Sequence, residues 1–341
     1  MSDHVMQDVL ALLAERKHLP RELATRAFQV IINGGATPAQ MAAFIMALRI
    51  KGETVDEITA GATVLRIKAA KITVPDGCID TCGTGGDAKG TYNISTAAAL
   101  VLAACGVPVA KHGNRSVTSR SGSADVLTAL GVKIDADIPV LERCLRECNI
   151  AFLMAPKFHS AMRHVAPVRQ ELGIRTIFNV LGPLANPALP PYQLLGVYSA
   201  AWIEPIAQVL KELGTKTAWV VHGSDGLDEL TITGASRVAE LKDGHIRTFE
   251  ITPEDAGLPR ASLEDIRGKT PDYNATALKD ALSGMESAYR NAVVLNAAAG
   301  LVITGKAADL KTGASLAREA IDSGNAHRIL TKLVMTSNER A

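Results

Sequence analysis

The sequence predicts an α/β protein with a small α-helical N-terminal domain and a larger α/β domain, whose mostly parallel central sheet is covered by helices. The chain has 341 residues, and a single hydrophobic core rarely grows beyond roughly 250–300 residues. The first 70 or so residues carry helix signals with little strand character. From residue 78 onward, short apolar segments alternate with helical ones, as in parallel β-α-β units. We therefore expect domains at 1–74 and 75–341.

The N-terminal helices are predicted from their start and stop signals. The stretch TPAQMAAFIMALRIKG has Thr37 as its N-cap and Gly52 just past its end. The stretch that follows begins with a capping box at Thr54. Together with two earlier helical stretches, these form the predicted helical domain. Helices from about 165–190 interrupt the later alternation, and we expect them to join this domain.

The larger domain is predicted from alternating apolar strands and helices. Strands are expected near 78–82, 107–111, 151–154, 193–198 and 217–222. Helices are expected near 95–105, 121–131, 138–148, 201–213, 276–290 and 314–322. Ligands of such sheets bind beyond the carboxyl ends of the strands. Motifs that directly follow strands are therefore the candidates for function.

Composition excludes several classes of protein. The 36 basic residues nearly balance the 35 acidic ones, so no nucleic-acid partner is expected. The longest apolar run is too short to span a membrane, and no signal-peptide pattern opens the chain. Five cysteines, an odd number, fit reduced thiols better than disulfides or structural zinc. We expect a cytoplasmic protein without a membrane partner.

The first motif is DTCGTGGDAKGTYNIST, residues 80–96. It fits neither a dinucleotide fingerprint, because no helix opens directly after the glycines, nor a P-loop, because no Lys-Ser/Thr follows Gly90. The backbone N–H groups of 83–87 can instead line a concavity for phosphate, and NIST offers a helix N-terminus. Asp87 fits this interpretation if it faces a ribose hydroxyl or a metal-bound pyrophosphate. Ser95 alone is equally well explained as an N-cap.

The second motif, KHGNRSVTSRSGSAD at 111–125, follows an apolar strand. It carries the cations Lys111 and Arg115 among several neutral hydrogen-bond donors. By itself it could be a solvated loop that caps the next helix. Its position at the same sheet edge as the glycine-rich motif favours a second anion-binding segment.

The third motif places Asp225, Asp228 and Glu229 after an apolar strand, with a spacing that does not match a calcium loop. Alone, it would be interpreted as a turn or a helix start. Beside two phosphate-binding segments it indicates Mg²⁺, which binds through one or two carboxylates together with substrate phosphates.

Taken together, GTGGD, NIST, KHGNR and DGLDE resemble the anthranilate phosphoribosyltransferases. These are the tryptophan-pathway members of the glycosyltransferase family that also includes pyrimidine nucleoside phosphorylases. The four motifs stand in the family's order and spacing, and the resemblance covers essentially the whole chain. It implies the two-domain fold predicted above, a homodimer formed through the helical domain, and a cleft between the domains.

The resemblance also implies roles for individual residues. Contacts to 5-phosphoribosyl 1-pyrophosphate (PRPP) would come from Gly83, Gly86, Asp87, Thr91, Asn93, Ile94, Ser95, Thr96, Lys111, His112, Gly113, Asn114, Arg115, Ser116, Val117, Thr118, Ser119 and Ser123. Anthranilate would be bound by Gly83, Asn114 and Arg169. Two Mg²⁺ ions would be held by Ser95, Asp228 and Glu229. Catalytic roles would fall to Asp87, Lys111 and His112.

Two of these assignments have plain alternatives. Arg163, Arg169 and Arg175 could all be solvated helix charges, although an aromatic carboxylate needs a planar bidentate donor; the resemblance, and not the spacing, selects Arg169. His112 could be a structural donor instead of a group that takes part in the chemistry.

The implied reaction transfers the phosphoribosyl group of PRPP to the amino group of anthranilate, giving N-(5-phosphoribosyl)anthranilate and pyrophosphate in tryptophan biosynthesis. The chain shows anion-binding segments and metal ligands but no Ser/His/Asp or Cys/His nucleophile set, which agrees with a reaction driven by charge stabilisation and alignment. Two alternatives stay open at this stage: a pyrimidine nucleoside phosphorylase on the same scaffold, and a non-catalytic relative that binds nucleic acid.

Overall fold

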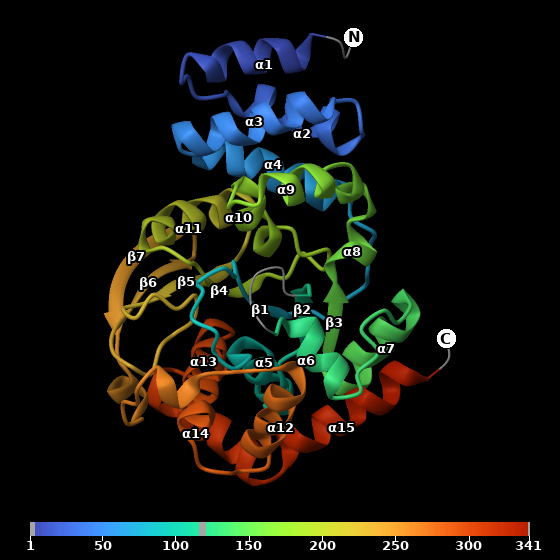
Figure 1. The fold of residues 1–341 in the computed structure, drawn as a ribbon. Helices are drawn as coiled ribbons and strands as arrows, with labels where there is room; N and C mark the ends of the chain where they lie inside the picture. Colours follow the sequence, from blue (N-terminus) through green and yellow to red (C-terminus); the bar gives the residue numbers. More distant parts are fainter. Residues whose placement is uncertain (1–3, 116–120, 340–341) are drawn as a thin grey trace.

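The structure, a computed structural model, describes residues 4–115 and 121–339. Its centre is a seven-stranded sheet with strand order β3-β2-β1-β4-β5-β6-β7 (Figure 1). The strands are β1 (Ile79–Gly83), β2 (Val109–Gly113), β3 (Ile150–Met154), β4 (Tyr192–Gly196), β5 (Thr217–Gly223), β6 (Ser236–Lys242) and β7 (His245–Ile251). The first five pair in parallel, and β6 and β7 add an antiparallel edge. The predicted fold class is confirmed.

The five predicted strands are all present, within two residues at each end. Strands β6 and β7 were not among the predicted elements. They form a hairpin whose turn, Asp243-Gly244, has positive φ at both residues. Asp-Gly is a strong hairpin signal, so the turn was detectable. However, β7 is largely exposed and therefore lacks the apolar run that marks the other strands.

Four helices precede the sheet: α1 (Val5–Ala14), α2 (Arg21–Ile32), α3 (Pro38–Lys51) and α4 (Val55–Lys68). Their predicted start signals are confirmed, because Thr37 Oγ1 accepts from Gln40 N at 3.2 Å and Thr54 Oγ1 accepts from Glu57 N at 3.3 Å. The Glu57 carboxylate is buried and pairs with Lys51 Nζ at 2.9 Å. Glu57, which belongs to the capping box of α4, thus also links α4 to α3.

The later helices are α5 (Ile94–Ala104), α6 (Ser123–Ala129), α7 (Ile138–Cys148), α8 (Ala155–Phe158), α9 (Ala166–Leu172), α10 (Ile177–Leu184), α11 (Ile203–Glu212), α12 (Pro271–Leu282), α13 (Ala288–Ile303), α14 (Leu310–Asp322) and α15 (Asn325–Asn338). The predicted helix near 276–290 is wrong, because the chain turns between α12 and α13. Gly284 has a φ of 94°, which no helix allows, and Ser287 starts α13 by accepting from Arg290 N. The other predicted helices are present.

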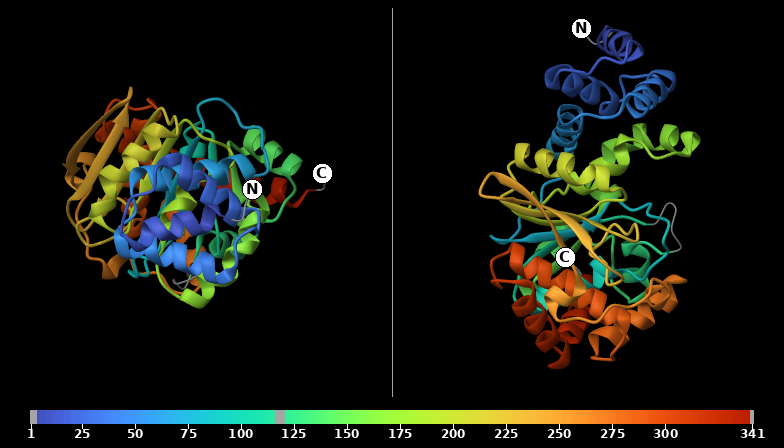
Figure 2. Two further views of the ribbon diagram at one scale, coloured as in Figure 1. Left: turned by 90° about the horizontal axis from the view of Figure 1, so that it is seen from above. Right: turned by 90° about the vertical axis from the view of Figure 1, so that its left-hand side faces the viewer.

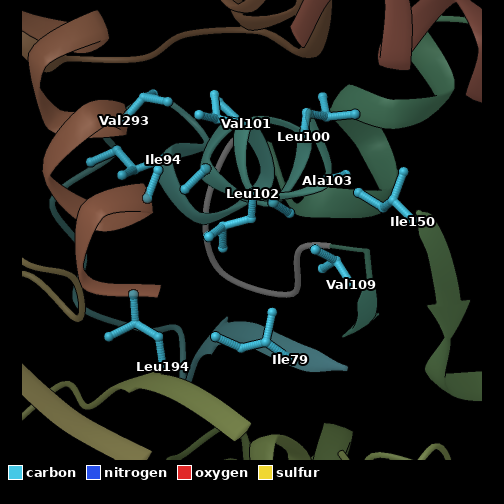
Figure 3. Close-up of a cluster of buried hydrophobic side chains, with 14 of the residues drawn as sticks. Ile79, Ile94, Leu100, Val101, Leu102, Ala103, Val109, Ile150, Leu194 and Val293 are labelled. Atoms are coloured by element: carbon cyan, nitrogen blue, oxygen red, sulfur yellow. The ribbon is translucent and has the colours of Figure 1, made fainter. Parts of the chain in front are cut away.

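Helices cover both faces of the sheet (Figure 2). Because side chains alternate along a strand, Leu194 packs in a core with α5 and α13, whereas Leu195 packs in a second core with α4, α10 and α11. Figure 3 shows the first core, in which Ile79 and Val109 of adjacent strands lie across from Leu102 of α5. The sheet is thereby held between two packed layers of helices.

Helices α1 to α3 extend away from the sheet at one end of the molecule (Figure 1). Phe28 of α2 packs edge-on against Phe44 of α3 and Phe178 of α10, with ring centroids 5.3 and 6.2 Å apart. Arg66 of α4 donates to the carbonyl of Leu184 at 2.7 Å. Segment 165–190 therefore lies against the N-terminal helices. Among the described residues, no helix is long and apolar enough to cross a lipid bilayer.

Candidate active site

Four parallel strands end in glycine at the sheet edge formed by the carboxyl ends of the strands. These glycines are Gly83 of β1, Gly113 of β2, Gly196 of β4 and Gly223 of β5. Strands β2 and β3 extend the sheet to one side of β1, while β4 and β5 extend it to the other. The strand order therefore reverses between β1 and β4, which is where doubly wound sheets bind their ligands.

The acidic loop after β5 folds back over this edge. A Cβ on Gly196 would overlap the carbonyl oxygen of Asp228, and one on Gly83 would overlap its Oδ2. A side chain at Gly196 would require the backbone of Asp228 to shift, and one at Gly83 would displace the Asp228 carboxylate. The absence of side chains at the ends of β1 and β4 is what lets Asp228 lie on the sheet edge.

Both carboxylates of the acidic pair accept from backbone N–H groups. Asp228 Oδ2 accepts from Gly85 N at 2.6 Å, and Glu229 Oε1 accepts from Ser95 N at 3.2 Å. The first amide lies in the glycine-rich loop and the second in the first turn of α5. The first and third predicted motifs therefore meet, and the structure brings together the metal candidates Ser95, Asp228 and Glu229.

The electrostatics of this cluster fit a divalent cation. Burial raises the pKa of Asp228 well above its usual range, and Asp87 and Glu229 raise it further. Burial likewise raises the pKa of Glu229 to about 7, against the attraction of Lys111. Buried carboxylates that lie close together beside a hydroxyl offer hard oxygen ligands, and a bound cation would stabilise their ionised forms. Within the described residues no three acidic, His or Cys side chains form a complete metal-binding set; Mg²⁺ bound partly through substrate phosphates does not require one.

Lys111 is the buried cation of the cluster. Its ammonium donates to the carbonyl of Thr81 and to Ser95 Oγ, the latter at 3.2 Å, and the residue is only 2% exposed. This predicted site residue is therefore positioned beneath the first turn of α5, where it fixes the hydroxyl of Ser95.

The backbone of the glycine-rich loop is left-handed at several positions. Gly85 and Gly86 have φ values of 67° and 76°, a region that glycine reaches without strain, and Ala88 has a φ of 59°. Asp87 Oδ1 accepts from Lys89 N at 3.1 Å. Thr91 lies farther along the loop, in a bridge to Arg267.

Arg175 also contacts this loop, although the sequence analysis gave it no role. It donates to the carbonyl of Gly86 and lies 4.7 Å over the ring of Tyr198. The sequence offered three arginines in one stretch with nothing to distinguish them, so only the folded structure identifies the one beside Gly86.

Asn93 joins three segments. Its Oδ1 accepts from Asn274 Nδ2 at 3.1 Å and from Ser121 Oγ at 3.3 Å, and its Nδ2 donates to Ser121 O at 3.1 Å. The side-chain amide of Asn93, which was predicted to contact the ligand, is thus hydrogen-bonded to other residues of the protein. Asn274 of α12 is a positioning residue with no local sequence signal. The neighbouring side chains of Ile94 and Thr96 are buried, and among the described residues Thr96 Oγ1 has no hydrogen-bond partner.

The second motif begins at the end of β2. His112 N donates to the buried carboxylate of Asp80 at 3.2 Å, and its ring lies 5.2 Å from that of His159 between centroids. Burial lowers the pKa of His112 to about 3, so the imidazole is neutral at pH 7. His112 Nε2 is buried and, among the described residues, has no hydrogen-bond partner.

The rest of this motif is more open. Asn114 and Arg115 are exposed, and Arg115 pairs with Asp125 at 3.1 Å. Gly113 allows close packing against Phe152, and Ser123 begins α6. The predicted contacts Ser116, Val117, Thr118 and Ser119 lie outside the described residues.

Arg169 lies on α9, away from the sheet edge. Its guanidinium is 5.4 Å over the ring of Phe178, and burial lowers its pKa. In the part of the chain that the structure describes, no hydrogen bond or ion pair engages its side chain. Asp225, the third acid after β5, instead bonds within its own loop, accepting from Thr231 Oγ1 at 2.6 Å.

Comparison with known proteins agrees with this architecture. Residues 7–69 match the helical bundle domain of the glycosyl transferase family, and residues 76–327 match its a/b domain. The chain is 58% identical to the anthranilate phosphoribosyltransferase of Rhodospirillum rubrum over 329 residues, covering 96% of this chain and 95% of that protein. It is also 58% identical to the enzyme of the same name from Parvibaculum lavamentivorans, covering 97% of both.

Solved structures show the same likeness. The anthranilate phosphoribosyltransferase of Thermus thermophilus superposes with a TM-score of 0.92 at 43% identity, covering 97% of this chain and 100% of that one. The Saccharomyces cerevisiae enzyme in complex with PRPP and Mg gives a TM-score of 0.89 at 28% identity, covering 98% of both chains. The resemblance predicted from the four motifs is confirmed.

Gly196→Ala should disturb the acidic loop. Because the new methyl group would overlap the backbone of Asp228, we expect the free energy of unfolding to fall by about 2–3 kcal/mol. The measurement is urea unfolding. Gly182→Ala is the matched control, because nothing lies within 4 Å of its Cβ and it is helical; it should be neutral or stabilising by about 0.5–1 kcal/mol. Equal stability of the two variants would contradict the proposed packing.

His112→Gln should make stability less sensitive to acid. The histidine pKa is about 3 in the folded state against 6.5 for the free side chain. Its contribution is therefore intact above about pH 6.5 and is lost as pH falls toward 3, at up to about 1.4 kcal/mol per pH unit. Urea unfolding at pH 7 and pH 5 should show a smaller loss for the variant. His245→Gln, at an exposed site, should lose as much as the wild type; a parallel loss in His112→Gln would refute the buried neutral state.

Proposed function

The chain belongs to the glycosyl transferase family whose helical-bundle and a/b domains it matches, and on this basis we propose that it is a phosphoribosyltransferase acting on anthranilate. It transfers the phosphoribosyl group of PRPP to the amino group of anthranilate and releases pyrophosphate, a step of tryptophan biosynthesis. The names of relatives that match it along almost their whole length support this activity. The observation that carries it is the meeting of Asp228 and Glu229 with the amides of Gly85 and Ser95.

The donor side of the site is assigned to the sheet edge. The amides of the glycine-rich loop and of the first turn of α5 bind phosphoryl oxygens, helped by the N-terminal end of the helix dipole. Asp87 orients the ribose. Lys111 holds the hydroxyl of Ser95, with which it shares a 3.2 Å contact.

Asp228, Glu229 and Ser95 hold Mg²⁺. The complex of the yeast relative with PRPP and Mg supports this metal, and two ions per site are proposed. Bound Mg²⁺ supplies the positive charge that stabilises the leaving pyrophosphate.

The acceptor side is assigned to Arg169, Asn114 and His112. The guanidinium of Arg169 would pair with the carboxylate of anthranilate in a bidentate contact. An aromatic amine is already neutral at pH 7, so no strong base is needed to make it a nucleophile. The neutral ring of His112 can accept a hydrogen bond from the amino group through Nε2, which no described residue engages. The yeast relative in complex with 4-fluoroanthranilate supports an acceptor of this class.

The arrangement of the whole protein is also part of the proposal. A boundary near residue 74 would separate the helical and α/β domains, and the helical domain would pair two copies into a homodimer. The cytoplasmic location expected from the sequence stays a prediction.

The activity is tested by following anthranilate fluorescence with the purified chain. We expect fluorescence to fall only when PRPP and Mg²⁺ are both present, with one pyrophosphate released for each anthranilate consumed. EDTA should stop turnover and leave the circular dichroism spectrum unchanged. Phosphate-dependent cleavage of a pyrimidine nucleoside, with no loss of anthranilate, would instead support the phosphorylase alternative.

Arg169→Ala and Arg175→Ala should affect different substrates. Loss of a charged hydrogen-bond pair should raise the KM for anthranilate about ten- to a hundredfold in Arg169→Ala, with little change in the KM for PRPP. Arg175→Ala, which removes the contact to Gly86, should mainly raise the KM for PRPP. Steady-state kinetics with each substrate varied in turn makes the measurement. Equal effects of Arg169→Ala on both constants would move this residue out of the acceptor site.

A further inference from the structure

The backbone donors assigned to the donor substrate are already occupied by protein carboxylates. Asp228 Oδ2 takes the N–H of Gly85 at 2.6 Å, and Glu229 Oε1 takes the N–H of Ser95 at 3.2 Å. A carboxylate and a phosphoryl oxygen are both anionic acceptors, and one N–H group cannot give a full bond to both. A phosphoryl group must therefore displace these carboxylates.

Charge adds to this competition. Asp87 of the glycine-rich loop lies beside the acidic pair, so three carboxyl groups meet here. Three cations also lie near. Lys111 is hydrogen-bonded to Thr81 and Ser95, and Arg175 to the carbonyl of Gly86. Lys89 lies beside Gly226 of the acidic loop. An anion without a counter-ion would enter against like charge.

The backbone of the acidic loop is anchored on both sides of the acidic pair. Asp228 rests on Gly196 and Gly83. Just beyond the pair, Leu230 is fixed on both sides by the buried Asn296, which accepts from its N–H at 3.1 Å and donates to its carbonyl at 2.9 Å. Rotation of the two acidic side chains is therefore the movement left to free the amides.

We propose that Asp228 and Glu229 make the donor site selective for an anion that arrives with a divalent cation. Without a cation, the pair holds the amides of Gly85 and Ser95 and excludes the free anion. A cation that draws the carboxylates toward itself releases both amides to phosphoryl oxygens. The two acids are thus specificity-determining residues in addition to metal ligands. The inference rests on the proposed function, which assigns these amides to the phosphoryl groups of the donor.

The test is calorimetric titration of the full chain with inorganic pyrophosphate, in Mg²⁺ and in EDTA. The wild type should bind at least tenfold more weakly in EDTA. Glu229→Gln and Asp228→Asn remove charge and keep shape, so each should bind pyrophosphate in EDTA about tenfold more tightly than the wild type, with a smaller effect of Mg²⁺. Asp243→Asn removes the same charge at the exposed turn between β6 and β7 and should behave as the wild type.

The outcomes distinguish the selectivity of the acidic pair from the existence of the donor site. If the wild type binds Mg²⁺-pyrophosphate but neither variant gains affinity in EDTA, the selectivity inference is overturned and the donor site stands. Equal affinity of the wild type in Mg²⁺ and EDTA overturns it as well. Absence of pyrophosphate binding in every protein and condition overturns both the inference and the donor site. The two variants are independent, so one that fails to fold leaves the other to decide.

Discussion

The close contact between Asp228 and the ends of β1 and β4 is the constraint on which the site depends. A Cβ on Gly196 would overlap the backbone of Asp228 and one on Gly83 would overlap its carboxylate, so the acidic loop lies directly on the sheet at the point where the strand order reverses. From there, its carboxylates reach the glycine-rich loop and the first turn of α5 together. A larger residue at these strand ends would push the acidic loop away from both segments.

The fold and the motifs could be predicted because their signals are local. Capping residues mark α3 and α4, apolar runs mark the parallel strands, and glycines mark the loop at 83–90. Strand order was inaccessible, since it arises from pairings such as Ile79 with Tyr192. The same is true of positioning residues: nothing near Asn274 in the sequence indicates that it holds Asn93, and nothing near Arg175 indicates that it lies against Gly86.

The two sides of the proposed site are built differently. The donor side rests on the sheet edge and on α5, whose core with the strands is continuous (Figure 3). The acceptor candidates divide between the end of β2, which bears His112, and α9, which bears Arg169 and packs among the N-terminal helices. A shift of those helices relative to the sheet would therefore move Arg169 and leave the donor side in place.

The hydrogen bond between Asn93 and Asn274 spans 181 positions of the chain, which has a consequence for how the protein matures. As the polypeptide leaves the ribosome, the glycine-rich segment appears long before its supporting helix, α12. The proposed donor site cannot be complete until most of the chain has been translated. Nascent chains that stop short of this helix would lack its support for Asn93, together with the helices α13 to α15 that share a core with α5.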